Sequence, residues 1–257
     1  MRRAVWMAVM MTSMSVVARA AELTADEIVA KANEAAYYAG EDGRATVSMR
    51  LSDGRSREFV ILRKDVPGGL DQMFYVYFKG PADVRKMSYL VHKHPGKDDD
   101  RWLFLPALNL VKRIAPGDKR TSFVGSDFLY EDVSGRGLDE DTHELVETTD
   151  AQYVVNNVPK DPAAIEFASY KVWIDKDTFL PRRAEYLDQN GTVYRRVSSG
   201  EIQTIQDYPT PTEQKVEDLA RGTSTTITFS EIKYDLGLNE RIFTERFLRR
   251  PPREVTQ

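Results

Sequence analysis

The sequence predicts a mainly β protein with some α structure: a curled antiparallel sheet with helices packed on its concave side. From residue 44 onward, apolar and polar side chains alternate with a period of two, which is typical of strands. Short turns join nearly all of these strands, so neighbours should run antiparallel. Helical patterns are confined to residues 24–39, a short stretch at 125–132 and a turn at 239–248.

The first helix carries its own start and stop signals. Thr24 and Glu27 have the spacing of a capping box, and Gly40 follows the last periodic residue. Its apolar face is built mostly of small side chains, which predicts close packing against a sheet. The residues on this face are Ile28, Ala32, Ala35, Ala36 and Ala39.

The next segments predict a hairpin, at residues 46–62, whose turn is Ser52-Asp53-Gly54-Arg55. Residues 72–79 are apolar on both faces, so this strand should be covered on both sides. A further strand follows at 87–94. Beyond residue 150 the same pattern continues, with Tyr208–Pro211 expected to be a loop. Strands are predicted at 153–155, 170–174, 180–186, 193–198, 201–206 and 223–234.

The stretch 101–135 brings three different pieces together. An apolar strand stops at Pro106, a second run spans 108–114, and a basic turn follows. Ser126 or Asp127 is the expected N-cap of a short aromatic helix. Strand, basic turn and helix suggest a wall, a rim and a lid around something hydrophobic.

Residues 1–20 have the pattern of a cleavable secretory signal: a basic start, an apolar run too short to span a bilayer, and an A-x-A site at 18–20. Residues 21–257 are expected to form a single domain. The sequence has no cysteine, which excludes disulfides and thiolate metal sites and leaves no residue for lipid attachment. We expect a periplasmic protein.

Loss of Arg2, Arg3 and Arg19 with the signal would lower the formal net charge from −4 to −7. An acidic exported protein is a poor candidate for binding nucleic acid. Against this background a local basic cluster stands out, which we interpret as a rim for anionic head groups or a docking patch for an acidic partner; the alternative is a solvated turn. The cluster is Lys112, Arg113, Lys119 and Arg120.

No catalytic or cofactor-binding motif is present, so the sequence predicts a protein that is not an enzyme and has no cofactor. The carboxylates at 127–132 are expected at a helix start because of the helix dipole. His92 and His94 precede three aspartates at 98–100, but they lie in a solvated turn, and a metal site is not predicted.

Three runs carry a resemblance to a known family: RWLFLPALNLVKRI, GSDFLYEDVSG and VWIDKDTFLPRRAEYLDQNG. Together they resemble the periplasmic outer-membrane lipoprotein-sorting proteins of the LolA/LolB-like superfamily, over residues 25–248. The resemblance implies an incomplete, half-open antiparallel β-barrel whose hollow holds acyl chains. It also implies transport of lipids or lipoproteins toward the outer membrane, with transient membrane contact only, in a branch often paired with RND-type exporters. The chain is longer than LolA, with extra strand material after about residue 190.

Burial of an acyl chain offers several kcal/mol at about 25 cal/mol per Å² of apolar area, so a carrier needs no reactive group. Our candidate cavity-lining residues are Tyr75, Tyr77, Tyr89, Trp102, Phe104, Phe123, Phe128 and Tyr130. A one-residue error in the assigned strand face would replace Trp102 and Phe104 by Leu103 and Leu105. The alternative function is a periplasmic adaptor that docks on an RND-type exporter without carrying lipid.

Overall fold

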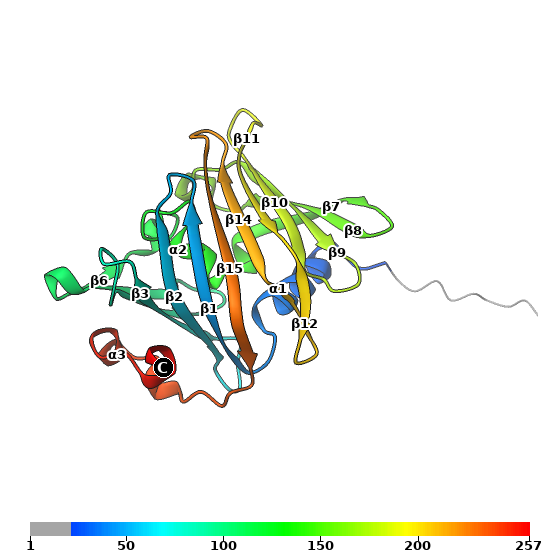
Figure 1. The fold of residues 1–257 in the computed structure, drawn as a ribbon. Coiled ribbons are helices and arrows are strands. Elements are labelled where there is room, and N and C mark those ends of the chain that lie inside the picture. The colour runs from blue at the N-terminus through cyan, green and yellow to red at the C-terminus, as the bar shows by residue number, and fades with distance from the viewer. Residues whose placement is uncertain (1–21) are drawn as a thin grey trace, which may run out of the picture.

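The computed structural model describes residues 22–257, and thirteen of their strands form one curled antiparallel sheet (Figure 1). A separate two-stranded hairpin, β12–β13, stands beside it. In spatial order the sheet strands are β6 (Leu110–Ile114), β5 (Asp100–Leu105), β4 (Ser88–Lys93), β3 (Gln72–Gly80), β2 (Ser56–Asp65), β1 (Asp42–Leu51), β15 (Thr223–Tyr234), β14 (Glu213–Asp218), β11 (Val193–Ser199), β10 (Pro181–Leu187), β9 (Ser169–Asp175), β8 (Gln152–Pro159) and β7 (Asp141–Thr148). The hairpin strands are β12 (Ile202–Ile205) and β13 (Tyr208–Pro211).

The helices are few and short. The α-helices are α1 (Ala25–Tyr37), α2 (Tyr130–Ser134), α3 (Glu245–Arg249) and α4 (Arg253–Thr256). The 3-10 turns are η1 (Pro106–Leu108), η2 (Pro116–Asp118), η3 (Leu138–Glu140), η4 (Pro162–Ala164) and η5 (Glu240–Ile242). None of the helices within residues 22–257 has the length and apolar character needed to cross a bilayer.

The sheet consists of two runs of sequential hairpins joined along one seam. Strands β1 to β6 lie side by side in chain order, and so do β7 to β11; β11 then pairs with β14, and β14 with β15. The seam is the pairing of β1 with β15, in which Val47 lies opposite Phe229. Strands β6 and β7 are the two edges, so the sheet does not close on itself. The predicted fold class, a curled antiparallel sheet with few helices, is confirmed.

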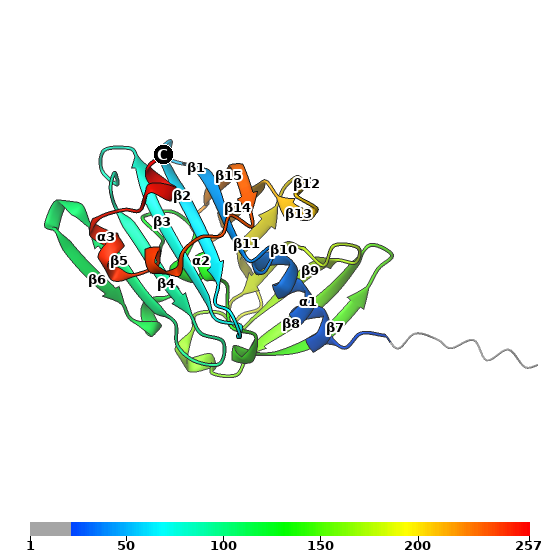
Figure 2. The same ribbon diagram turned by 90° about the horizontal axis from the view of Figure 1, so that it is seen from below.

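Helix α1 packs on the inner face of the sheet near β7 and β8 (Figure 2). The predicted capping box is confirmed, since the Thr24 hydroxyl accepts from the Glu27 backbone N–H while the Glu27 carboxylate accepts from Thr24. Ile28 and Ala32 are buried against Val155 of β8 and other apolar side chains. Close packing is therefore confirmed for Ile28 and Ala32, whereas Ala35 and Ala39 are half-buried and Ala36 is exposed.

The connection from β6 to β7 lies inside the curl and fills one end of it. Phe123 stands at its centre, with ring centroids 5.8 Å from Phe78, 5.5 Å from Tyr89 and 5.6 Å from Tyr130. These rings belong to the main apolar cluster on the concave side. We call residues 115–140 the plug, because their buried side chains occupy this end of the half-barrel.

The C-terminal segment covers the opposite, convex face of β2 to β5 (Figure 2). The hydroxyls of Tyr75 and Ser88 donate to the carbonyls of Phe247 and Leu248, at 2.8 and 2.6 Å. Strand β3 is thereby buried on both faces, as predicted. The helical turn expected at 239–248 is present as η5 and α3.

Several sequence-based expectations are wrong or incomplete. Residues 208–211 form strand β13 rather than a loop, and the strands β7 and β14 were not predicted. Neither Ser126 nor Asp127 is an N-cap, because α2 begins at Tyr130 and the Asp132 carboxylate accepts from the Leu129 backbone N–H. The predicted signal at residues 1–20 lies outside the described residues.

Candidate functional site

A cavity of about 430 Å³ lies between α1 and the concave face of the sheet. Its walls are mainly apolar and come from α1, from strands on both sides of the β1–β15 seam and from the plug. The apolar residues lining it include Val29, Ala32, Ala36, Ala45, Met49, Phe59, Ile61, Phe74, Val76, Phe123, Phe128, Val172, Ile174, Leu180, Ala184, Val197, Ile227, Phe229 and Ile232. Its size falls in the range of about 300–1,000 Å³ that is usual for small-molecule sites.

Part of this apolar lining is open to water. Ile61, Val197 and Phe229 are only half-buried, although they point to the concave side. On α1, Val29 and Ala36 belong to the same face, and Ala36 is exposed. Small side chains on the helix leave space that larger ones would fill. Exposed apolar surface inside a concavity indicates a place for an apolar guest.

The hairpin β12–β13 borders the cavity through its second strand. Pro209, Thr210 and Pro211 line it, and the hydroxyls of Thr210 and Tyr234 lie 2.9 Å apart. The Gln206 amide donates to the Tyr234 carbonyl and accepts from its N–H. These bonds fix the hairpin to the end of β15, so it serves as a fixed wall.

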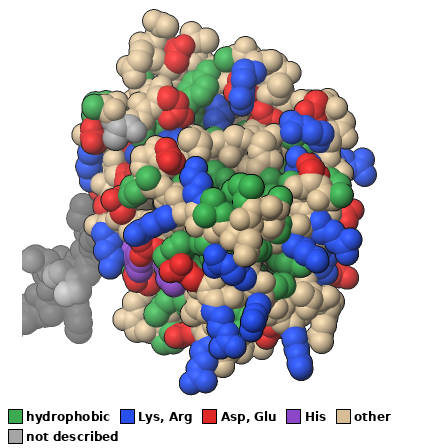
Figure 3. All heavy atoms as spheres, turned by 90° about the vertical axis from the view of Figure 1, so that its left-hand side faces the viewer, with side chains coloured by type: hydrophobic (Ala, Val, Ile, Leu, Met, Phe, Trp, Pro, Cys, Tyr) green, Lys and Arg blue, Asp and Glu red, His purple; other side chains and the backbone are tan. Residues whose placement is uncertain are grey.

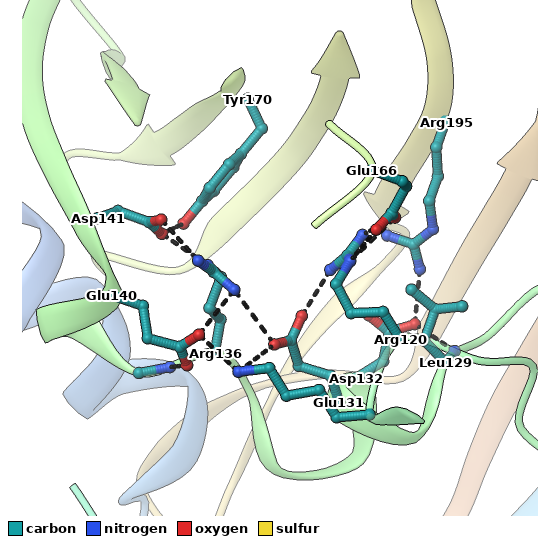
Figure 4. A network of polar contacts seen from close by, with 12 residues as sticks. Arg120, Leu129, Glu131, Asp132, Arg136, Glu140, Asp141, Glu166, Tyr170 and Arg195 are labelled. Carbon is teal, nitrogen blue, oxygen red and sulfur yellow. Dashed lines mark hydrogen bonds and ion pairs between the residues drawn. The ribbon is translucent and has the colours of Figure 1, made fainter. Parts of the chain in front are cut away.

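The plug end of the cavity is held by buried charges (Figure 4). The Glu131 carboxylate contacts three cations: Arg120 at 2.5 Å, Lys119 at 3.2 Å and Arg136 at 3.4 Å. Arg136 also forms a two-pronged pair with Asp141. Burial would raise the pKa of Glu131, but the three cations outweigh it and hold the pKa below its usual range.

Arg120 links this network to the second half of the sheet. Its guanidinium donates to Glu166 and stacks over the rings of Phe167 and Tyr186, at 4.7 and 5.2 Å. Nearby, Arg195 donates to Asp132 at 2.6 Å. Together with the Asp127 carboxylate, which accepts from two threonine hydroxyls of β15, these bonds fasten the plug to the sheet.

Beneath the plug, Lys93 is a buried amine that donates to the Ser134 carbonyl at 2.6 Å. Burial lowers the pKa of Lys93 from 10.5 to about 8, and Arg101 adds to this effect while Asp99 opposes it. Between these two pKa values the unfolded chain binds more protons than the folded one, so this group makes stability rise with pH.

We therefore expect the Lys93→Met variant to lose this pH dependence. The free energy of unfolding of the native chain relative to K93M should increase from about pH 7.5 to about pH 9.5. Urea unfolding of both proteins at the two pH values measures the difference. A difference that does not change with pH contradicts the expectation.

Four of the eight predicted cavity aromatics lie on the concave side. Phe123 and Phe128 line the cavity, while Tyr89 and Tyr130 are buried in the cluster behind them. The placement of the other four in the cavity is wrong, because they face the convex side, against the C-terminal segment. These four are Tyr75, Tyr77, Trp102 and Phe104. Leu103 and Leu105 occupy the concave side of β5 instead.

The predicted basic patch is split in two by the fold. Lys112 and Arg113 are exposed on the edge strand β6, beside Leu108 and Leu110, which are 69% and 46% exposed. Figure 3 shows this side of the molecule, with hydrophobic side chains at its centre and Lys and Arg around them. Lys119 and Arg120 are mostly buried, with 19% and 7% of their side chains exposed, because their charges pair with Glu131 and its neighbours. The expectation of a four-residue patch is corrected to Lys112 and Arg113, the latter paired with Asp100.

The histidines take structural positions. His94 lies between the carboxylates of Asp71 and Asp100, at 2.7 and 3.6 Å, and His92 bonds the Phe243 carbonyl. Across residues 22–257 no cluster of three or more His, Asp or Glu side chains is arranged to hold a metal ion.

Sequence reasoning missed the wall built from β9, β10 and β11. Val172, Ala184 and Val197 line the cavity from these strands. The alternation of Ala184 and Val197 with polar neighbours was a detectable signal of one apolar face. It also missed Arg182, an inward-facing arginine at the end of this wall.

The open antiparallel half-barrel with an apolar cavity beneath a helix is a LolA-like fold. Among solved structures, the chain is similar to a DUF1329 family protein from Desulfovibrio piger (28% identity over 87% of this chain and 97% of that one, TM-score 0.80). It is also similar to a putative outer membrane lipoprotein-sorting protein domain from Vibrio parahaemolyticus (27% identity, 88% and 98%, TM-score 0.79). A LolA superfamily protein from Nitrosomonas europaea shares the fold (20% identity, 88% and 100%, TM-score 0.66).

The family model described as "-like: Uncharacterized protein" matches residues 70–250, and the chain belongs to this family. The solved structures above share its LolA-like fold. No curated protein matches the chain.

Proposed function

We propose that this protein is a periplasmic carrier that binds lipid or lipoprotein acyl chains in its cavity and moves them toward the outer membrane. The observation that carries the proposal is the apolar cavity of about 430 Å³ between α1 and the sheet, part of whose lining is only half-buried. Water in contact with this lining is unfavourable, and a bound acyl chain would displace it.

The energetics favour reversible binding. Each buried methylene contributes about 0.8 kcal/mol, so a tail of several carbons offsets the entropy lost on association. Most polar groups at the plug end are already paired with one another, as with Arg136 and Asp141. A tail entering from the open side would therefore meet apolar walls first, and no covalent chemistry is needed. The proposal includes neither a catalytic residue nor a cofactor.

The periplasmic location rests on the secretory signal predicted at residues 1–20, and the outer-membrane direction rests on a relative. The Vibrio parahaemolyticus neighbour is described as a putative outer membrane lipoprotein-sorting protein domain, and we extend a lipid- or lipoprotein-binding role to this chain. An RND-type exporter as partner remains a prediction. So does contact of head groups or a partner with Lys112 and Arg113, which lie exposed beside Leu108 and Leu110.

Filling the cavity is expected to abolish tail binding. Ala36 is exposed on α1 and lines the cavity, so the Ala36→Trp variant places an indole where the tail should lie. Ala30 is exposed on the same helix outside the lining, and Ala30→Trp is the matched control. We expect A36W to bind a fluorescent fatty acid at least about tenfold more weakly than A30W.

Native mass spectrometry of the protein from its own periplasm distinguishes the carrier from the adaptor. A stoichiometric lipid mass that is lost on denaturation supports the carrier. A lipid-free mass, with no lipid taken up from vesicles and equal behaviour of A36W and A30W, contradicts it and favours the adaptor.

A further inference from the structure

We propose that Arg182 is a binding site for the anionic head group of the cargo, so that the preferred ligand is an anionic amphiphile with its tail in the cavity. This inference rests on the proposed carrier function and adds the chemistry of the head. It depends on three observations: one cation faces the cavity, polar groups lie next to it, and the other charged residues of the lining are paired with one another or with nearby charges.

Arg182 lies on β10 at the end of the apolar wall. Arg182 lines the cavity together with Ala184 and Tyr186, which follow at intervals of two and therefore lie on the same face of the strand. The guanidinium donates to the Gly200 carbonyl at 3.0 Å, just beyond the end of β11. The side chain is half-buried, so its remaining donors are partly shielded from bulk water without being closed off.

The charge of Arg182 lacks a direct counter-ion. Among residues 22–257, no carboxylate oxygen lies within 4.0 Å of its guanidinium. Asp175 is near enough for Arg182 to contribute to lowering its pKa, but the Asp175 Oδ1 accepts from the Thr178 N–H and hydroxyl. A guanidinium has five donor N–H groups, and within residues 22–257 Arg182 makes one hydrogen bond, to the Gly200 carbonyl.

The other charged residues of the lining are all neutralised. Their ion pairs are Arg44–Glu231 at 3.5 Å, Arg63–Asp65 at 3.0 Å, Asp132–Arg195 at 2.6 Å, Arg136–Asp141 at 2.8 Å and Arg183–Glu185 at 3.8 Å. Arg182 is therefore the cavity's uncompensated charge within the described part of the chain. A cation at the margin of an apolar cavity favours a ligand that brings an apolar tail and an anion together.

Two more polar groups stand near this cation. Ser199 donates to the Pro181 carbonyl, next to Arg182, and Gln214 pairs with Ser199 across β11 and β14. Gln214 lines the cavity and is half-buried. A carboxylate or phosphate bound by Arg182 would lie within the same polar margin. The shared chemistry is an oxyanion, which a fatty acid or an anionic phospholipid supplies.

The test compares head groups on one tail. Displacement of the neutral dye N-phenyl-1-naphthylamine from the full mature chain measures binding of oleate, oleoyl lysophosphatidate and oleyl alcohol. We expect Arg182→Gln to weaken binding of the anions about tenfold and to leave oleyl alcohol unchanged. Arg196→Gln is the matched control, because this guanidinium on the neighbouring strand β11 pairs with Glu185 at 2.9 Å and does not line the cavity; it should leave all three ligands unchanged.

Each outcome separates the head-group site from the cavity. Loss of affinity for either anion in R182Q alone supports the inference and identifies carboxylate or phosphate as the source. Equal binding of oleate and oleyl alcohol, unaltered in R182Q, overturns the head-group site while leaving the carrier function intact. Failure of the native chain to bind any oleyl ligand overturns the carrier function itself.

Discussion

Replacing Glu131 with glutamine is expected to lower the free energy of unfolding by about 3–5 kcal/mol, the usual cost of breaking a buried ion pair from one side. Glu131 is 3% exposed and is the shared partner of Lys119, Arg120 and Arg136. Without its charge, three buried cations compete for the carboxylates that remain. Urea unfolding near pH 7, monitored by circular dichroism, measures the change.

Glu140 is the matched control for this variant. Its carboxylate contacts Lys119 and Arg136 in the same network, but its side chain is 31% exposed, so water replaces much of what Glu140→Gln removes. We expect a loss of about 1 kcal/mol or less. The pKa of Glu131 is lower in the folded protein than its value of 4.5 in the unfolded chain. The charge of Glu131 therefore stabilises the fold fully above pH 4.5, and this contribution is lost as the pH falls through the folded pKa. Equal losses in E131Q and E140Q would contradict a central role for Glu131.

The second large effect is expected from Phe123→Ala. The ring of Phe123 is 2% exposed and contacts four other rings, so truncation should cost about 3–5 kcal/mol. The ring centroids of its partners lie at 6.3 Å for Phe59, 5.8 Å for Phe78, 5.5 Å for Tyr89 and 5.6 Å for Tyr130. The same urea titration measures this loss. The urea concentration at half-unfolding should fall, while the dependence of the unfolding free energy on urea concentration should not change.

Phe229→Ala supplies the comparison, because Phe229 lines the same cavity but is half-buried. The variant should lose less stability than F123A and should weaken binding of a fatty-acid probe, since it removes apolar wall without removing the aromatic cluster. A small loss of stability in F123A would show that the plug is not held to the sheet by these rings.

The sequence was sufficient to predict the curled antiparallel sheet, the capped helix on its concave side and the two-sided burial of β3. It could not distinguish the faces of β3 and β5. Both faces of these strands are apolar, so Tyr75 and Phe74 present equally good patterns, and only the position of the C-terminal segment decides between them. The edge strand β7 was missed because its mostly exposed side chains leave little apolar alternation to detect.

The site was predicted less well than the fold, for a related reason. Lys119 and Arg120 look like surface residues in sequence, and their burial depends on Glu131, Glu140 and Glu166, which lie between 11 and 46 residues further along the chain. Charge compensation of this kind is a tertiary property. Arg182 was missed for the opposite reason: it faces the cavity, but nothing in the sequence distinguishes it from Arg183 until the strand face is known.

The seam between β1 and β15 has a consequence for how the chain reaches this structure. Most pairings in the sheet join neighbours along the chain, so they close short loops at low entropic cost. The pairing of Val47 with Phe229 instead encloses most of the polypeptide and has by far the largest sequence separation in the sheet. Contacts of this kind slow folding, because the chain must lose the conformational entropy of closing a long loop before the contact can stabilise it. The cavity spans this seam, with Met49 on one side and Ile227 on the other, so a competent binding site exists only after the most non-local step of folding is complete.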